Sequence, residues 1–229
     1  MPELSIQQHP SPNFNDRRDG DHITMLVLHY TGMQSGTAAL ERLCDPEAAV
    51  SAHYLVEEDG RIFQLVAEDK RAWHAGAGFW RGERDINSRS IGIEIVNPGH
   101  EFGYRPFPEP QMQSVEALSA AIVTRYKIDP INVIGHSDLA PARKMDPGEL
   151  FDWQRLAAIE VGLWCEAGSQ VTPTEDQFLE DLETIGYDLE DISATITAFQ
   201  RHWAPDQVGE GANLPTRRMA RALALMLMT

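Results

Sequence analysis

The sequence predicts an α/β fold in which helices flank a mixed central β-sheet, followed by a small three-helix bundle. Residues 23–30 form a nearly continuous apolar run, as expected for a strand that is buried on both faces of a sheet. Segments of strand character then alternate with segments of helical spacing up to about residue 163, which is typical of helices that cover a sheet. Beyond residue 174 only helical spacing remains, and this predicts the bundle.

The first part of the chain contains the predicted sheet. We expect strands at residues 23–30, 53–56, 61–66, 90–96 and 131–134. We expect helices at residues 37–44, 109–126 and 149–163. The second and third strands flank Glu57-Glu58-Asp59-Gly60, whose Asp-Gly pair predicts the tight turn of a hairpin. The helix at 109–126 is expected to end before Asp129-Pro130, because proline disfavours a helical residue before it.

The last part of the chain predicts a second domain. Residues 166–173 contain glycine, serine and proline and are expected to form a linker between a domain at 10–165 and one at 174–229. Thr174 followed by Glu175 and Asp176 is typical of a helix start. Further helices are expected at about 191–203 and 216–228. Three short helices of this length predict a small bundle that is able to fold alone.

The composition excludes some classes of function. The 19 Lys and Arg residues against 35 Asp and Glu give a net charge of −16, so the chain lacks the basic surface that nucleic acids require.

No apolar segment is long enough to span a membrane. The N-terminus lacks the features of a secretory signal, which favours the cytoplasm; the alternative is the periplasm, if a signal has been removed. The two cysteines, Cys44 and Cys165, are expected to be buried thiols.

The most informative motif covers residues 131–148. An apolar run is followed by His136, Lys144 and Asp146 on a loop with two prolines. Histidine and carboxylate suit a catalytic zinc, which takes three protein ligands and leaves a fourth position for water. Lys144 and Asp146 are two residues apart and would point the same way in an extended loop, which places a cation beside a metal ligand. This arrangement suits the hydrolysis of a carbonyl compound.

A third ligand is expected from His29, at the end of the strand at 23–30. A single histidine there could equally be a core residue with its hydrogen bonds satisfied. However, functional sites gather at strand ends in α/β sheets, and His136 also follows a strand. His29, His136 and Asp146 together would form an open three-ligand site for one zinc ion.

Glu94 is an unusual residue for an apolar strand. By alternation it shares one face with Gly92, while the neighbouring isoleucines share the other. One interpretation is a buried carboxylate that is tied to the backbone or to an arginine. The other is a general base beside metal-bound water, with its pKa raised by burial. In the second interpretation Gly92 would leave room for a substrate.

The substrate is expected to meet an aromatic platform. Trp73 offers an apolar face and one N–H donor, and His74 follows it directly in the sequence. The alternative is that Trp73 is a core residue. His53 is expected to line the cleft, whereas we interpret His100 and His202 as structural. The full set of expected substrate contacts is Tyr30, His53, Trp73, His74, Asn97 and Arg143.

Five motifs occur in order and are recognisable together. They are Leu28-His29-Tyr30-Thr31, Ser51-Ala52-His53-Tyr54 with Asp59-Gly60, Trp73-His74-Ala75-Gly76, Ser90-Ile91-Gly92-Ile93-Glu94, and residues 135–148. This pattern resembles the zinc-dependent N-acetylmuramoyl-L-alanine amidases, a family that includes phage T7-type lysozyme and the peptidoglycan recognition proteins. The resemblance covers roughly residues 10–165.

The resemblance implies zinc held by His29, His136 and Asp146, with Glu94 as the catalytic acid/base and Lys144 stabilising an oxyanion. It also implies hydrolysis of the amide bond between N-acetylmuramic acid, or its anhydro form, and L-alanine. Phage-type members have a tyrosine directly before the histidine matched by His53, where this chain has Ala52. That difference places the chain nearer the bacterial recycling and cell-wall amidases.

The C-terminal segment resembles a peptidoglycan-binding three-helix module. The resemblance rests on Phe178, Leu179, Leu182, Gly186-Tyr187 and the run at 198–203, while the usual turn before the last helix is replaced by Gly209-Glu210-Gly211. The expected partners are soluble muropeptides and anhydro-muropeptides, or polymeric peptidoglycan. The alternative function is a non-catalytic peptidoglycan-recognition protein; such relatives lose a zinc ligand, and here all three positions are intact.

Overall fold

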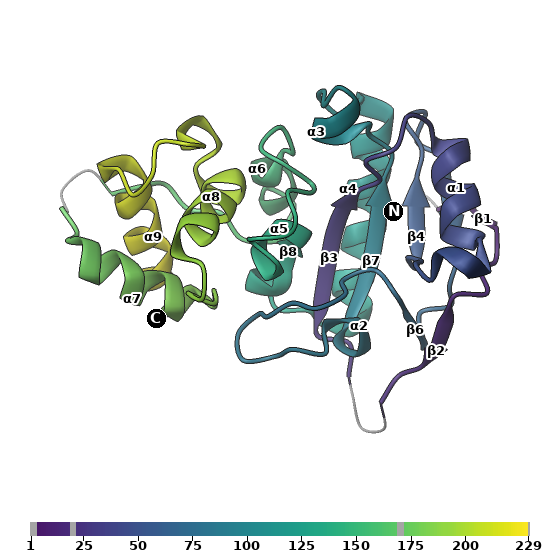
Figure 1. Cartoon of the computed structure of the whole chain (residues 1–229), viewed down its shortest axis with the longest axis horizontal. Helices are drawn as coiled ribbons and strands as arrows, with labels where there is room; N and C mark the ends of the chain where they lie inside the picture. The colour runs from purple at the N-terminus through teal and green to yellow at the C-terminus, as the bar shows by residue number, and fades with distance from the viewer. Residues whose placement is uncertain (1–3, 19–21, 169–171, 229) are drawn as a thin grey trace.

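The computed structural model describes residues 4–18, 22–168 and 172–228 of the chain. Its centre is a six-stranded sheet with the strand order β1-β5-β4-β7-β3-β8 (Figure 1). The strands are β1 (Ile6–Gln8), β3 (Met25–Tyr30), β4 (Tyr54–Val56), β5 (Ile62–Gln64), β7 (Ser90–Ile95) and β8 (Val133–Gly135). A separate two-stranded sheet pairs β2 (Phe14–Asp16) with β6 (Lys70–Ala72). The predicted α/β class with a mixed sheet is confirmed.

The middle of the sheet is parallel. β3 pairs in parallel with both β7 and β8, and β4 pairs in parallel with β7. β4 and β5 form the predicted antiparallel hairpin. Because parallel strands end at the same edge of a sheet, the residues at the ends of β3, β7 and β8 come together there.

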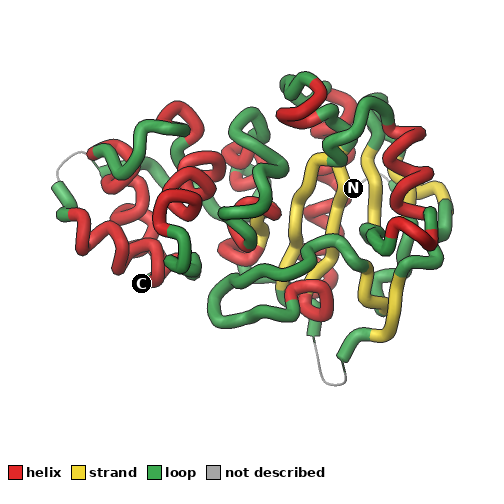
Figure 2. Tube along the Cα trace, viewed as in Figure 1, coloured by secondary structure: helices red, strands yellow, loops and turns green. Residues whose placement is uncertain are grey.

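Helices surround the sheet and form the C-terminal part of the chain (Figure 2). The α-helices are α1 (Gly36–Cys44), α2 (Ile86–Arg89), α3 (Gly99–Phe102), α4 (Glu109–Tyr126), α5 (His136–Leu139), α6 (Trp153–Ala157), α7 (Glu175–Ile185), α8 (Ile192–Trp203) and α9 (Leu214–Leu227). Short 3-10 helices are η1 (Pro46–Ala48), η2 (Pro130–Asn132) and η3 (Pro205–Gln207). No described helix meets the length and hydropathy that crossing a membrane requires.

The two faces of the sheet have different cores. Leu26 and Leu28 of β3 pack with Leu118 and Ile122 of α4, so this helix covers one face. Val27 points to the opposite face, where it belongs to a different cluster. His29 follows Val27 at the alternate position of the same strand and therefore also lies on the face away from α4.

The predicted helix at 149–163 is wrong for most of its length, since only Trp153–Ala157 is helical. The side chain of Asp152 accepts a hydrogen bond from the Arg155 backbone and starts the helix there. Glu160 and Gly162 adopt left-handed backbone conformations, which end it. The expectation that both cysteines are buried is correct for Cys165, whereas Cys44 is partly exposed.

The helices α7, α8 and α9 lie beyond the edge strand β8 (Figure 1). Phe178, Phe199 and Leu223 form their centre, and the same cluster of buried side chains continues into Ile134 and Leu139 of the sheet domain. The described helices therefore share one hydrophobic core with the sheet. The predicted linker at 166–173 includes three residues, 169–171, that lie outside the described ones.

Candidate metal centre and active site

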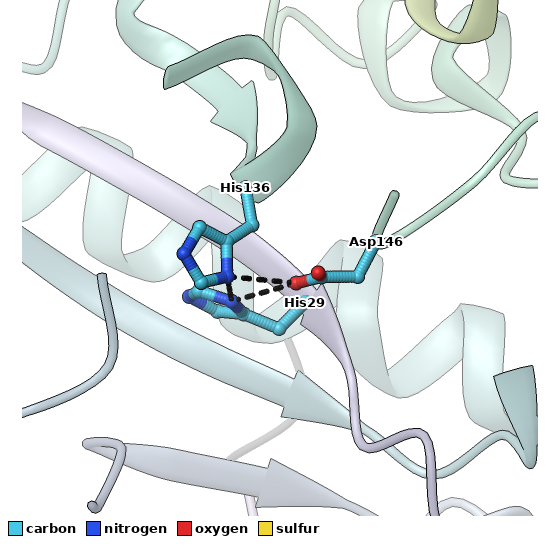
Figure 3. A group of neighbouring side chains, drawn as sticks. All are labelled: His29, His136 and Asp146. Carbon is cyan, nitrogen blue, oxygen red and sulfur yellow. Dashed lines mark hydrogen bonds and ion pairs between the residues drawn. The ribbon is translucent and has the colours of Figure 1, made fainter. Parts of the chain in front are cut away.

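Three predicted ligands converge at the ends of β3 and β8 (Figure 3). His29 Nδ1 lies 2.9 Å from His136 Nδ1 and 2.9 Å from Asp146 Oδ2. His136 Nδ1 lies 3.0 Å from the same carboxylate oxygen. His29 comes from β3, His136 begins α5 directly after β8, and Asp146 lies on the loop that follows. These three residues form the one cluster with metal-ligand geometry among the described residues.

The tautomer of His136 is fixed by its other ring nitrogen. Nε2 lies 2.9 Å from the backbone carbonyl of Ala75, which can only accept a hydrogen bond. Nε2 therefore carries the proton, and in the neutral ring the lone pair is on Nδ1. This lone pair faces the carboxylate of Asp146, so two acceptors point at each other.

The tautomer of His29 is fixed by a longer relay. The Ser90 hydroxyl donates to the Ile86 carbonyl at 2.7 Å, so its oxygen accepts from His74 Nε2 at 3.1 Å. His74 Nδ1 then accepts from His29 Nε2 at 3.0 Å. The His29 lone pair is consequently on Nδ1 and also faces the centre of the cluster. A ligating histidine commonly donates its second N–H in this way.

These three lone-pair donors fit a divalent cation. Their lone pairs converge with no proton between them, which is repulsive unless a positive charge lies at the centre. Burial lowers the pKa of His29 to about 4, so the ring is neutral and able to ligate at neutral pH. Two imidazole nitrogens and one carboxylate suit zinc in an open, catalytic geometry.

A cavity of about 320 Å³ opens beside the cluster. Glu94 and Lys144 both line it, together with His136 and Asp146. Glu94 is the register partner of His29 on β7. Its Oε2 atom is shielded from solvent and has no hydrogen-bond partner among the described residues. Burial, and then the charge of Asp146, raise the pKa of Glu94 well above its usual value, while Lys144 opposes the shift.

The expectation that Gly92 leaves room for a substrate is wrong. A Cβ atom at this position would lie 2.5 Å from the ring of His74. The space above Gly92 is therefore filled by His74, which supports His29. The absence of a side chain serves the relay and not the substrate.

The remaining predicted contacts fall into two groups. Tyr30, Trp73, His74 and Arg143 line the cavity. His53 and Asn97 are buried and are not among its lining residues. The Nε2 atom of His53 lies 3.0 Å from the Arg17 guanidinium, and the Asn97 side chain donates to the Arg105 carbonyl at 2.7 Å. The structure thus brings four of these six residues to the cavity.

Sequence reasoning missed three residues around the site. Ser90 completes the His29 relay, Arg42 of α1 lines the cavity, and Asp138 forms buried contacts with the C-terminal helices. Ser90 is the first residue of the predicted strand at 90–96, and nothing in its position there indicates a contact with a histidine. Asp138 stands three residues after Gly135, which is the spacing of a helix-capping carboxylate, and this signal could have singled it out.

The sequence of the chain is similar to those of known amidases. A family model described as N-acetylmuramoyl-L-alanine amidase matches residues 19–149. The chain is 38% identical to the amidase AmiD of Escherichia coli K12, over 88% of this chain and 82% of that protein. It is 36% identical to the 1,6-anhydro-N-acetylmuramyl-L-alanine amidase AmpD of Citrobacter freundii, over 66% of this chain and 87% of that protein.

Solved structures give the same result. The E. coli AmiD complex with anhydro-N-acetylmuramic acid-L-Ala-D-γ-Glu-L-Lys superposes with a TM-score of 0.81 at 34% identity, covering 93% of this chain and 98% of that one. AmpDh3 of Pseudomonas aeruginosa with anhydromuramic pentapeptide gives 0.82 at 29% identity, covering 99% of each chain.

The fold and the site together define an amide hydrolase of the bacterial cell wall. The chain belongs to the N-acetylmuramoyl-L-alanine amidase family. As an amidase of this family it acts on the bond between N-acetylmuramic acid and L-alanine, in keeping with the turnover and recycling of cell-wall fragments.

Proposed function

We propose that this amidase works with one zinc ion held by His29, His136 and Asp146. The convergence of three lone pairs on one point supports the proposal most directly, because the tautomers set by the Ala75 carbonyl and by the Ser90 relay leave no histidine proton in any of the three contacts. When bound there, the ion would lower the pKa of a water molecule towards about 7 and withdraw charge from the substrate carbonyl.

We propose Glu94 as the acid/base of the reaction. Its Oε2 atom is buried, unpartnered and part of a carboxylate at the cavity wall, so the group is able to accept the proton of the attacking water. The raised pKa of Glu94 helps the second step, in which the same group returns the proton to the departing amine of L-alanine. A carboxyl with an ordinary pKa would hold this proton less well.

Lys144 is proposed to stabilise the negative charge that develops on the former carbonyl oxygen. It lines the cavity next to Asp146, in the same loop as this ligand. A fixed ammonium group in a site with little water stabilises such a charge more strongly than it would in bulk water.

The proposed substrate contacts are Tyr30, Trp73, His74 and Arg143, which share the cavity wall. The Trp73 indole donates to Asn15 at 2.6 Å, which fixes the ring plane as a platform for a sugar or peptide. His53 and Asn97 are proposed to act indirectly: His53 accepts a hydrogen bond from the Gly92 backbone of β7, and Asn97 orders the turn after this strand.

We propose soluble anhydro-muropeptides as the preferred substrate and the cytoplasm as the compartment. The first proposal is supported by the anhydromuramic peptides bound in the AmiD and AmpDh3 structures. The second is supported by the two free thiols, which suit a reducing compartment. Polymeric wall in the periplasm is the alternative, and the resemblance of the C-terminal helices to a wall-binding module favours it.

The decisive experiment measures zinc content together with peptide release. Purified protein is expected to hold one zinc ion and to release free peptide from an anhydro-muropeptide until a chelator removes the ion. A protein that binds the muropeptide without releasing peptide would be a recognition protein instead. Assays on intact sacculi beside the soluble substrate, with cell fractionation, decide between the two substrates and compartments.

A further inference from the structure

A second buried carboxylate lies two residues from the metal ligand His136. Asp138 is 1% exposed and accepts three hydrogen bonds. The Gly135 backbone donates at 2.8 Å, the Tyr187 hydroxyl at 2.5 Å and the His202 Nδ1 atom at 2.7 Å. Tyr187 follows α7 and His202 belongs to α8. The C-terminal region therefore supplies two of the three donors to a residue of the turn that begins with His136.

The donors themselves have little freedom to move. The His202 ring is stacked between Trp153, with centroids 3.8 Å apart, and Trp203, with centroids 4.0 Å apart. The Trp203 indole donates to the Tyr187 hydroxyl at 3.2 Å, so both donors belong to one packed group. His202 and Trp203 belong to α8, Tyr187 lies between α7 and α8, and Trp153 comes from α6 of the sheet domain.

The helix α5 connects this group to the metal ligands. It has a single turn, in which His136 is the first residue and Asp138 the third. The Ser137 backbone donates to the Asp146 carbonyl at 2.9 Å. A rotation of this turn would therefore move the His136 ring and the Asp146 loop together. Asp138 is the side chain through which α7 and α8 hold the turn in place.

The residue before His202 makes a second connection. Arg201 lies 3.7 Å from Glu149, whose carboxylate lies 3.2 Å from His100. The other ring nitrogen of His100 lies 3.0 Å from the Tyr30 hydroxyl at the cavity wall. Tyr104 stacks on His100 and donates to the Pro147 carbonyl, next to Asp146. Two neighbouring residues of α8 thus reach both sides of the metal-ligand loop.

We propose that the C-terminal helices are a structural part of the metal centre, with His202 and Tyr187 as positioning residues that act through Asp138 on His136. This inference rests on the proposed metal site. It gives the module a function in addition to any wall binding: the geometry of the ligands depends on α8 being docked.

The test compares zinc affinity in full-length variants. Tyr187→Phe and His202→Leu each remove one donor to Asp138, whereas His202→Asn keeps a donor near the position of Nδ1. Phe199→Leu is the matched control, because Phe199 is buried in the same helix and packs against the Tyr187 ring, but its side chain has no donor for Asp138. Zinc dissociation constants come from chelator competition, and the absorption spectrum of the cobalt-substituted protein reports the ligand geometry.

We expect the zinc dissociation constant to rise about 10-fold in Tyr187→Phe and His202→Leu, within the range known for groups that support metal ligands. The cobalt spectrum should change in both, kcat should fall more than KM rises, and His202→Asn should restore most of the affinity. Phe199→Leu should lower stability without changing zinc affinity or the spectrum.

Two results would overturn the inference. One is that Tyr187→Phe and His202→Leu match the wild type in zinc affinity and cobalt spectrum. The other is that Phe199→Leu shows the same losses, which would make the effect one of general stability. A wild-type protein that binds no zinc overturns the proposed function itself, and this result is distinct from the other two.

Discussion

Two buried histidine–aspartate pairs of the described residues, His136–Asp146 and His202–Asp138, differ in where their protons lie. In the first, His136 and Asp146, the histidine presents a lone pair to the carboxylate, because its N–H is already used by the Ala75 carbonyl. In the second, His202 and Asp138, the carboxylate accepts from three donors and its oxygens are satisfied. The same residue types thus form an open pair, in which two acceptors face each other and would suit a cation, and a closed pair, in which the carboxylate is hydrogen-bonded.

The two pairs differ in their effect on stability. Without a cation an open pair would be costly, since two acceptors face each other in a buried place. A closed pair stabilises the packing around it and holds its neighbours still. The single turn of α5 links the two pairs, because His136 of the open pair and Asp138 of the closed pair both belong to it.

Removing the carboxylate of the open pair should have the largest effect on activity. Asp146→Ala is expected to lose its zinc and to lower peptide release by more than about 1000-fold, because the ion contributes more than one electrostatic stabiliser does. Metal analysis and chromatography of the released peptide measure both. In the matched variant of the closed pair, Asp138→Asn, zinc should still bind, though more weakly, while the free energy of unfolding falls by about 1–3 kcal/mol. If the two variants lost zinc equally, the distinction between the pairs would be wrong.

Glu94→Gln should lower kcat by about 100- to 10,000-fold, the range for loss of a general acid/base, while zinc content stays unchanged. The pH profile gives a second measurement. Because the pKa of Glu94 is raised, the group is protonated and unable to accept a proton up to a higher pH than usual. The acidic limb of kcat/KM in the wild type should therefore lie above about 4.3, the ordinary glutamate value. A residual rate in Glu94→Gln with the wild-type acidic limb would assign that limb to another group.

Lys144→Met keeps the length of the side chain and removes its charge. We expect kcat to fall by about 100- to 1000-fold with zinc still bound, because an oxyanion stabiliser acts on the transition state. The open pair itself would be intact in this variant. A rise in KM alone, with kcat unchanged, would instead make Lys144 a substrate-binding residue.

The open pair was largely predictable from the sequence, whereas the closed pair was not. His29, His136 and Asp146 follow strand ends or lie in a recognisable loop, so strand patterning brings them to one edge of the sheet. The contact between Asp138 and His202 joins residues 64 positions apart in two regions that were expected to be separate domains. It depends on how α8 docks, and docking is decided by side-chain shape at Trp153 and Trp203, which periodicity does not report.

The same reasoning explains why Gly92 was misinterpreted. A glycine opposite a predicted base suggests an opening, but only the tertiary structure shows that the His74 ring enters it. The predicted helix at 149–163 was too long for a local reason. Glu160 has a left-handed backbone conformation after the helix, and this residue carries no distinctive sequence signal. The elements with strong periodicity, such as α4, were predicted to the residue.

Ser90→Ala should have the smallest effect and tests how His29, the third ligand beside the open pair, is held with its lone pair towards the cluster. Without the hydroxyl, His74 Nε2 loses its acceptor, so His74 is free to protonate Nδ1 and can no longer hold His29 with its lone pair towards the cluster. We expect zinc affinity to fall by about 10-fold, with kcat at saturating zinc nearly unchanged. Ser119→Ala is the matched control, because Ser119 is a buried serine of α4 with no hydrogen-bond partner for its hydroxyl among the described residues. Equal zinc affinity in both serine variants would show that the tautomer of His29 is set without the relay.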